Sequence, residues 1–113
     1  MHGLKTLRVY QAALQYAAAV GRFLRSTPAA PRKDAEQLRT AAKSIGDNIA
    51  EGHGYGVGNN RLRVYRLARG SAQESLNQLR GFLDDQLIER KEFYLLFNLG
   101  RTIVKMLDKQ IGD

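Results

Sequence analysis

Cysteine is absent from this chain, and only two of its 113 residues are proline and two are histidine. Without cysteine the protein has no disulfide, no zinc ribbon and no thiol nucleophile, and a reducing compartment suits it. Both prolines, Pro28 and Pro31, fall in one short segment, so proline interrupts a helical pattern at one place only. Stability must therefore come from the packing of one chain or of an assembly.

The scarcity of histidine argues against catalysis. His2 is terminal and His53 falls in a glycine-rich segment, so neither stands on a rigid element that would orient the base of a Ser-His-Asp triad. A di-metal carboxylate bundle needs Glu-x-x-His pairs on facing helices, and the sequence contains no such pair. We therefore expect a protein that is not an enzyme and that holds no metal and no cofactor.

Glycines occupy alternate positions from Gly52 to Gly58, which invites comparison with a phosphate-binding loop. A Walker loop follows a strand and ends in lysine beside serine or threonine, whereas this segment follows a helical pattern and lacks that pair. A dinucleotide fingerprint needs a βαβ unit, which the sequence does not predict. We interpret the segment as a flexible connection, with Gly52 ending the helix before it.

Long hydrophobic runs are also missing. The apolar run from Ala12 to Val20 follows Lys5 and Arg8 as in a signal peptide, but Gln15 interrupts it. The run also falls far short of the ~20 apolar residues that a membrane span needs. The sequence therefore predicts a cytoplasmic protein without a membrane partner.

The composition that remains is that of a folded, basic protein. Hydrophobic residues make up 43% and charged residues 26% of the chain, and the length suits a single domain over residues 1–113. The formal net charge is +7, which favours a polyanionic partner such as RNA, DNA or an acidic protein surface. The simpler interpretation is that the surplus charge only keeps the surface soluble.

Apolar residues recur at helical spacing in four segments, and no segment of useful length alternates as a strand does. An asparagine before the third segment is a good N-cap. Amphipathic helices with short connections predict an all-α, antiparallel up-down four-helix bundle. The first segment runs from about Leu4 to Arg25, and the second starts within Pro31–Asp34 and ends at about Glu51. The third runs from Asn59 or Asn60 to about Leu87. The fourth follows a turn within Asp84–Lys91 and ends at Ile111.

The first segment is apolar over more than one stripe, which predicts more than one neighbouring helix. The main stripe predicted to face the core contains Leu7, Tyr10, Leu14, Ala17, Ala18, Gly21 and Leu24. A second set broadens this surface and contains Val9, Tyr16, Val20 and Phe23.

Two motifs resemble those of a known family. The first motif is Ser44-Ile45-x-x-Asn48-Ile49-Ala50-Glu51-Gly52, and the second is Ala68-x-Gly70-Ser71-Ala72-x-Glu74. The start of the chain, with Leu7-x-Val9-Tyr10-Gln11-x-Ala13, also fits the family. This pattern is similar to that of the intervening-sequence proteins, four-helix bundles encoded by insertions in bacterial large-subunit ribosomal RNA genes. A departure from the family is the glycine-rich segment after Glu51-Gly52, where members usually have a more polar stretch.

The resemblance carries expectations about partners. It implies a ring-like homo-oligomer, commonly a pentamer. A related branch is the accessory variability determinant of diversity-generating retroelements, a basic bundle that binds nucleic acid and works beside a reverse transcriptase. A reverse transcriptase is therefore a second expected partner, beside nucleic acid and copies of the chain itself.

The polar residues of the two motifs have a structural and a chemical interpretation. We predict a network that fixes how the second and third helices pair, since a buried polar group can set register at a cost in stability. A ligand-binding or catalytic pocket is the alternative. The predicted network consists of Arg39, Asn48, Glu51, Ser71 and Glu74.

Four arginines fall within nine residues at the start of the third segment, and no acidic residue interrupts them. Arginine at a helix N-terminus opposes the helix dipole, which favours a partner anion there. The alternative is a solvated helix start with Arg69 paired internally, and Arg101 and Lys105 are attributed to an ordinary exposed face. The residues predicted to bind nucleic acid are Arg61, Arg63, Arg66, Arg69, Arg80 and Tyr65, whose ring would stack on bases.

Three functions remain open on this reasoning. The first is a non-catalytic, homo-oligomeric bundle that binds RNA or DNA through its arginine-rich surface. The second is an accessory subunit that contacts a reverse transcriptase or another nucleic-acid enzyme. The third is a purely structural assembly whose charge only maintains solubility.

Overall fold

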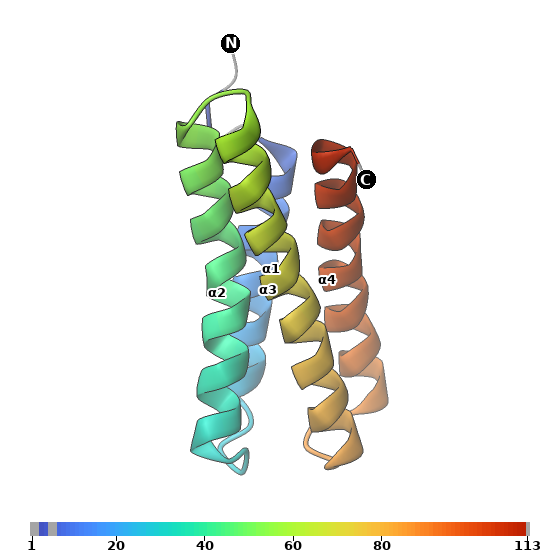
Figure 1. Ribbon diagram of the computed structural model, residues 1–113. Helices are drawn as coiled ribbons and strands as arrows, with labels where there is room; N and C mark the ends of the chain where they lie inside the picture. Colours follow the sequence, from blue (N-terminus) through green and yellow to red (C-terminus); the bar gives the residue numbers. More distant parts are fainter. Residues whose placement is uncertain (1–2, 5–6, 113) are drawn as a thin grey trace.

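The computed structural model describes residues 3–4 and 7–112, and within them the protein is a bundle of four helices without a strand. The prediction of an all-α, antiparallel four-helix bundle is confirmed. Figure 1 shows successive helices running in opposite directions, and the molecule measures 44 × 24 × 23 Å. The helices are α1 (Arg8–Arg25), α2 (Arg32–Gly54), α3 (Asn59–Asp84) and α4 (Arg90–Ile111).

The helix boundaries follow local chemistry at the proline-containing connection. Helix α1 ends at Arg25, and the hydroxyls of Ser26 and Thr27 donate to the Phe23 carbonyl at 2.7 and 2.8 Å. These bonds satisfy one of the carbonyl groups that a helix end leaves without an intrahelical partner. Helix α2 then begins directly after Pro31, whose fixed φ suits a helix start. Lys5, which the sequence places in the first helix, and His2 lie outside the described residues.

The face of α1 that enters the core differs from the predicted main stripe. Leu14, at the centre of that stripe, is 50% exposed, whereas Ala13 and Tyr16 are 1% and 0% exposed. Because this helix is rich in alanine and apolar on several sides, its own sequence does not decide which side its neighbours cover. Of the predicted main stripe only Leu24 is buried, whereas all four residues of the predicted second set are buried and form most of the core face. The buried residues of α1 are Val9, Ala13, Tyr16, Val20, Phe23 and Leu24.

A hydrogen-bonded pair of side chains joins α1 to α3 inside the core. The hydroxyls of Tyr16 and Ser75 lie 2.8 Å apart, and Ser75 Oγ donates to the Ala72 carbonyl at 2.7 Å. Since serine has one hydroxyl proton, Tyr16 is the donor to Ser75 Oγ. Gly100 of α4 makes room for the pair, because a Cβ there would lie 2.6 Å from Leu76 Cδ2 and 3.2 Å from the Tyr16 hydroxyl.

Helix α2 does not end at Gly52. It continues to Gly54, and Gly52 is buried inside it. A Cβ at Gly52 would lie 2.7 Å from Cδ1 of Tyr65, so glycine at this position allows α3 to approach closely. The prediction that Gly52 ends the helix is wrong, and the backbone turns with positive φ at Gly56 and Gly58 instead.

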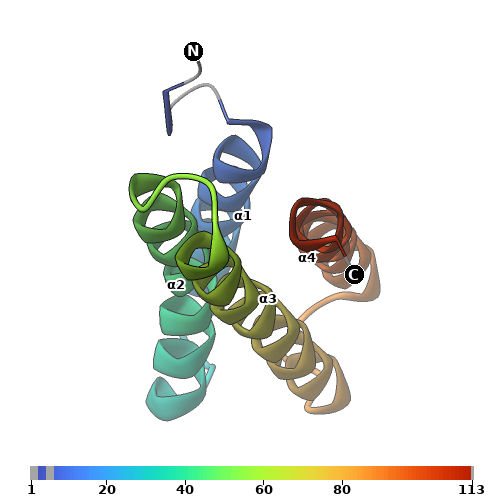
Figure 2. The same ribbon diagram turned by 45° about the horizontal axis from the view of Figure 1, so that its top comes forward.

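The start of α3 also differs from the expected asparagine cap. The capping position is Gly58, with φ of 142°, and it makes no side-chain cap hydrogen bond. Asn59 is already the first residue of the helix, so neither asparagine is the N-cap. The positive-φ glycine helps to reverse the chain, and Figure 2 shows α2 and α3 close together at the loop that joins them and farther apart at their other ends. Helix α3 ends at Asp84, before the predicted Leu87.

Candidate nucleic-acid interface

Helix α3 carries one exposed polar face along most of its length. Arg66, Gln73, Asn77 and Arg80 are separated by seven, four and three residues, so they share one side of the helix, and all four are exposed. The opposite side of α3 is buried in the core. A row of cations and amides is therefore held along a rigid element.

Arg61 does not belong to this row, because its guanidinium contacts the end of α2. Its Nε donates to the Gly52 carbonyl at 3.2 Å and its Nη2 donates to the His53 carbonyl at 2.9 Å. These carbonyls are in the last turn of α2, where they also accept the backbone N–H groups of Tyr55 and Gly56 at 3.2 Å. Arg61 therefore ties α2 to α3, and its predicted contact with nucleic acid would compete with these bonds.

The Tyr65 ring is also held within the fold. It is 1% exposed and packs against the backbone of Gly52. Burial raises the pKa of Tyr65, and the nearby charge of Arg61 lowers it by less. A buried ring has no free face for a base, so the prediction that Tyr65 stacks on nucleic acid is wrong for this conformation.

Arg69 pairs with an acid across the bundle. Its Nη1 lies 2.8 Å from Oδ1 of Asp108 on α4, and the arginine side chain is 21% exposed. This contact is the internal pairing that the sequence left as an alternative for Arg69. Arg63, by contrast, is exposed, as Arg66 is, and among the described residues no acidic group forms an ion pair with either.

The polar face of α3 opens into a groove of about 640 Å³ between α3 and α4. Two cations of α4, Arg101 and Lys105, lie one helical turn apart and line it together with Arg80 of α3. Its remaining lining residues are Gln73, Leu76, Asn77, Phe97, Val104 and Asp108. Arg101 and Lys105 were attributed to an ordinary exposed face, and only the packing of α4 on α3 places them in one groove with Arg80.

The groove has a surplus of positive charge. Asp108 is the acid among its lining residues, and Arg69 already pairs with it. Arg80, Arg101 and Lys105 therefore have no acidic counterpart within the lining of the groove. A concave surface between low-dielectric helices concentrates the field of such charges, which favours an anionic ligand.

An aromatic stack forms one wall of the groove. The guanidinium carbon of Arg80 lies 4.9 Å from the centre of the Phe97 ring. The Phe97 ring stacks on Phe93, with 5.1 Å between ring centres and 29° between ring planes. A guanidinium over an aromatic face is a cation–π contact, which holds the arginine in place at the rim.

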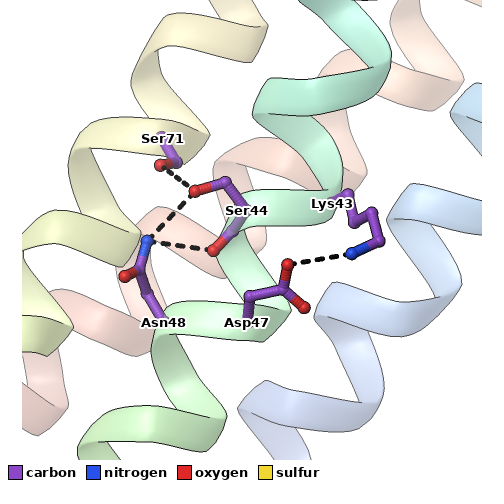
Figure 3. Close-up of polar contacts among 5 residues, drawn as sticks. All are labelled: Lys43, Ser44, Asp47, Asn48 and Ser71. Atoms are coloured by element: carbon purple, nitrogen blue, oxygen red, sulfur yellow. Dashed lines mark hydrogen bonds and ion pairs between the residues drawn. The ribbon is translucent and has the colours of Figure 1, made fainter.

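The predicted polar network forms only in part. Figure 3 shows Asn48 and Ser71 brought together through Ser44, which was not among the predicted members. The Asn48 amide donates to the Ser44 carbonyl at 3.0 Å and to Ser44 Oγ at 3.1 Å, and Ser44 Oγ lies 3.0 Å from Ser71 Oγ. These contacts join α2 to α3, as the structural interpretation expects.

The other predicted members lie elsewhere. Arg39 pairs with Glu36 on its own helix at 2.8 Å, and Glu51 accepts a long hydrogen bond of 3.5 Å from the Tyr55 hydroxyl. Glu74 is exposed at the edge of a depression of about 300 Å³ beside Ser44 and Ser71. The structure therefore brings together Asn48 and Ser71 and separates Arg39 and Glu51 from them.

Two further findings bear on possible chemistry. No group of three or more histidine, aspartate or glutamate side chains within residues 3–4 and 7–112 gathers in a way that could hold a metal ion. In the same part of the chain, no helix is both long enough and apolar enough to cross a membrane.

Comparison with known proteins identifies a family. The family model of the 23S rRNA-intervening sequence proteins matches residues 5–109. A protein of unknown function from the S23 ribosomal protein family of Bacteroides thetaiotaomicron VPI-5482 has a similar structure, with a TM-score of 0.85 and 21% sequence identity over 93% of this chain and 99% of that one. At this identity the likeness concerns the fold alone. No curated protein matches the chain.

Proposed function

The chain belongs to the family of 23S rRNA-intervening sequence proteins, and from this premise we propose that it is a non-catalytic bundle that binds nucleic acid through the basic face of α3 and α4. The observation that carries the proposal is the groove that Arg80, Arg101 and Lys105 line without an acidic counterpart among its lining residues. The net charge of +7 supports it, because phosphate contacts dominate the affinity of such complexes. A cytoplasmic location is part of the proposal.

The dimensions of the basic face suit a polymer. Arg66 and Arg80 are fourteen residues apart on α3, which corresponds to about 21 Å along the helix axis. Arg101 and Lys105 widen the face onto α4. Cations spread over such a length can neutralise several successive phosphates, whereas a small anion would use only one or two of them.

Salt-dependent binding tests this proposal. The logarithm of the binding constant should fall linearly with the logarithm of the salt concentration, with a slope of about 0.7 to 0.9 for each phosphate neutralised. The triple variant Arg80→Gln, Arg101→Gln, Lys105→Gln should lower the affinity at low salt and reduce the slope by about 2. The assay is fluorescence anisotropy of labelled single-stranded and duplex RNA and DNA.

A matched control separates the groove from net charge. Arg32 and Lys33 at the start of α2 and Arg90 at the start of α4 are exposed and do not line the groove. Replacing all three with glutamine removes the same charge as the groove variant, and the slope should change less. Equal effects of the two triple variants, or no binding at low salt by the unmodified protein, would refute the proposed interface.

Self-association is the second part of the proposal. Leu95 and Leu99 of α4 are 56% and 40% exposed. The two leucines of α4 also line a groove of about 500 Å³ beside Ala19 of α1. A surface with several large apolar side chains is typical of an interface, and the family resemblance favours a ring of five copies.

Light scattering with size-exclusion chromatography tests the assembly. The unmodified protein should elute as an oligomer, and the variant Leu95→Glu, Leu99→Glu should elute as a smaller species because charge is costly in a buried interface. Leu67 and Val57 are exposed apolar residues on other surfaces, so Leu67→Glu, Val57→Glu is the matched control and should keep the oligomer.

The exposed leucines also favour a second candidate function. The same apolar surface fits a protein partner such as a reverse transcriptase, for which the chain would be an accessory subunit. A monomeric unmodified protein, combined with capture of a purified reverse transcriptase that the leucine variant abolishes, would favour this candidate over self-assembly. An oligomeric protein that binds no nucleic acid at low salt and captures no reverse transcriptase would leave the purely structural assembly.

A further inference from the structure

We propose that the groove between α3 and α4 is a binding site for single-stranded nucleic acid, in which one base stacks on the Arg80 guanidinium and flanking phosphates contact Arg101 and Lys105. The inference rests on the proposed function and specifies its ligand. It depends on a combination that phosphate binding alone does not require: an aromatic wall, two exposed amides and three cations within one groove.

The wall of the groove is already arranged as a stack. Phe93, Phe97 and Arg80 follow one another, with 5.1 Å between the two ring centres and 4.9 Å from the guanidinium carbon to the Phe97 centre. Arg80 is exposed at the outer end of this stack. Bases of single strands stack on guanidinium planes as they do on aromatic rings, so a base can extend the series.

The contact with Phe97 also prepares Arg80 for this role. A free arginine side chain loses rotamer freedom when a ligand immobilises it, which subtracts from the affinity. The cation–π contact restrains Arg80 before the ligand arrives. The same contact leaves the guanidinium charge in place, so Arg80 still attracts a phosphate backbone during encounter.

Two amides lie beside the stack. Asn77 and Gln73 precede Arg80 by three and seven residues on the same face of α3, and both line the groove. A primary amide carries both a donor and an acceptor, which match the exposed edge of a base. The Asn77 Oδ1 also accepts a long hydrogen bond of 3.4 Å from Arg80 Nη1, which holds this amide beside the guanidinium. Phosphate alone offers acceptors and would be served as well by further cations, so the amides favour a ligand whose bases are accessible.

A duplex does not meet these conditions. Its bases are paired and stacked with each other, and their faces are covered. The groove volume of about 640 Å³ is that of a site for a ligand of small-molecule size, which suits an unpaired nucleotide. Duplex RNA or DNA would contact the cations from outside and leave the stack unused.

Arg80→Lys is the variant that separates stacking from charge, because it keeps the cation and removes the planar guanidinium. The probes are a labelled single-stranded RNA, the same sequence as DNA, the matching duplexes, and a single strand of equal length without bases. The variant should lose about tenfold in affinity for both base-carrying single strands. Its affinity for the duplexes and for the abasic strand should change less than about twofold, because their phosphate contacts remain.

A second measurement uses the absence of tryptophan from the chain. In the variant Phe97→Trp the indole is the sole tryptophan, and it stands under Arg80 in the groove wall. Single strands with bases should change its fluorescence at saturation, whereas duplexes and the abasic strand should leave it nearly unchanged. The two single-stranded probes also show whether the site distinguishes RNA from DNA.

The outcomes separate this inference from the proposed function. Failure of every probe to bind at low salt overturns both. Binding of single strands, duplexes and the abasic strand with similar affinity, with no selective loss in Arg80→Lys, overturns the single-strand site and leaves a phosphate-binding surface. Circular dichroism of Arg80→Lys, whose side chain is exposed, should match the unmodified protein and exclude misfolding as the cause of a loss.

Discussion

The stability of the bundle should depend on alkaline pH through one buried phenol. Burial raises the pKa of Tyr16 from 10.0 to about 12, and the hydrogen bond with Ser75 lowers it by less. A group with a higher pKa in the folded state contributes its full stability below the unfolded pKa and loses it as the pH rises through the folded pKa. The contribution of Tyr16 is therefore complete below pH 10 and is lost between pH 10 and about 12.

The variant Tyr16→Phe removes the titrating hydroxyl and keeps the ring. At neutral pH it deprives Ser75 Oγ of its donor inside the core, which should cost about 1 kcal/mol. The raised pKa of Tyr16 corresponds to about 3 kcal/mol that the unmodified protein loses when the phenol ionises. The unmodified protein should thus be more stable at neutral pH, and the variant should be more stable above about pH 11.

Urea unfolding followed by circular dichroism at a series of pH values measures this crossover. The difference between the two proteins isolates Tyr16, because other groups such as Tyr65, whose pKa burial also raises, are present in both. Tyr94 is 51% exposed, so Tyr94→Phe is the control and should show no crossover. A difference between unmodified protein and Tyr16→Phe that stays constant up to pH 12 would refute the assignment of a buried, hydrogen-bonded phenol.

Three glycines of the helices should respond differently to alanine, as thermal unfolding will show. Gly100→Ala should destabilise the bundle by about 1–3 kcal/mol, since the new methyl group would overlap core side chains. Gly52→Ala should cost a similar amount because of the ring packed against it, and a stable variant at either position would contradict the packing. Gly70→Ala, where nothing lies within 4 Å of the added carbon, should instead stabilise α3 by about 0.5–1 kcal/mol; a loss of stability there would indicate a contact that the monomer lacks.

The architecture was predictable because several independent signals agree. Apolar spacing fixed the number of helices, and Pro28 and Pro31 marked the first connection, where α1 ends and α2 begins. Individual glycines were less informative, since a glycine can end a helix or admit a neighbour. Gly52 does the second, and only the position of the Tyr65 ring distinguishes the two.

The core face of α1 shows a further limit of sequence periodicity. Leu14 and Ala13 are neighbours in an apolar helix, and the smaller residue is buried while the larger one is exposed. Periodicity predicts a buried stripe only when polar residues mark the other side. Alanines and larger apolar residues lie on several sides of α1, so its sequence alone does not mark the side that its neighbours cover.

The groove was missed for a different reason. Arg80 and Arg101 are twenty-one residues apart on separate helices, and no local pattern tells which faces of two helices meet. The clustered arginines of the α3 start were easier to notice, yet Arg61 binds the carbonyls at the end of α2 and Arg69 pairs with Asp108. The number of arginines in a segment therefore overestimates how many can bind a ligand, because some guanidinium groups already donate hydrogen bonds to other parts of the fold.

Some arginines connect two helices and others are exposed, so mutations can test protein stability and nucleic-acid binding separately. Arg61 and Arg69 bridge helices, so Arg61→Gln and Arg69→Gln should lower the midpoint of urea unfolding because each removes hydrogen bonds between two helices. Arg66 and Arg80 are exposed, so Arg66→Gln and Arg80→Gln should leave the midpoint nearly unchanged and reduce the salt slope of nucleic-acid binding by about 1 each. The reverse pattern would mean that the α3 start, and not the groove, contacts the phosphates, and that the bonds of Arg61 break when nucleic acid binds.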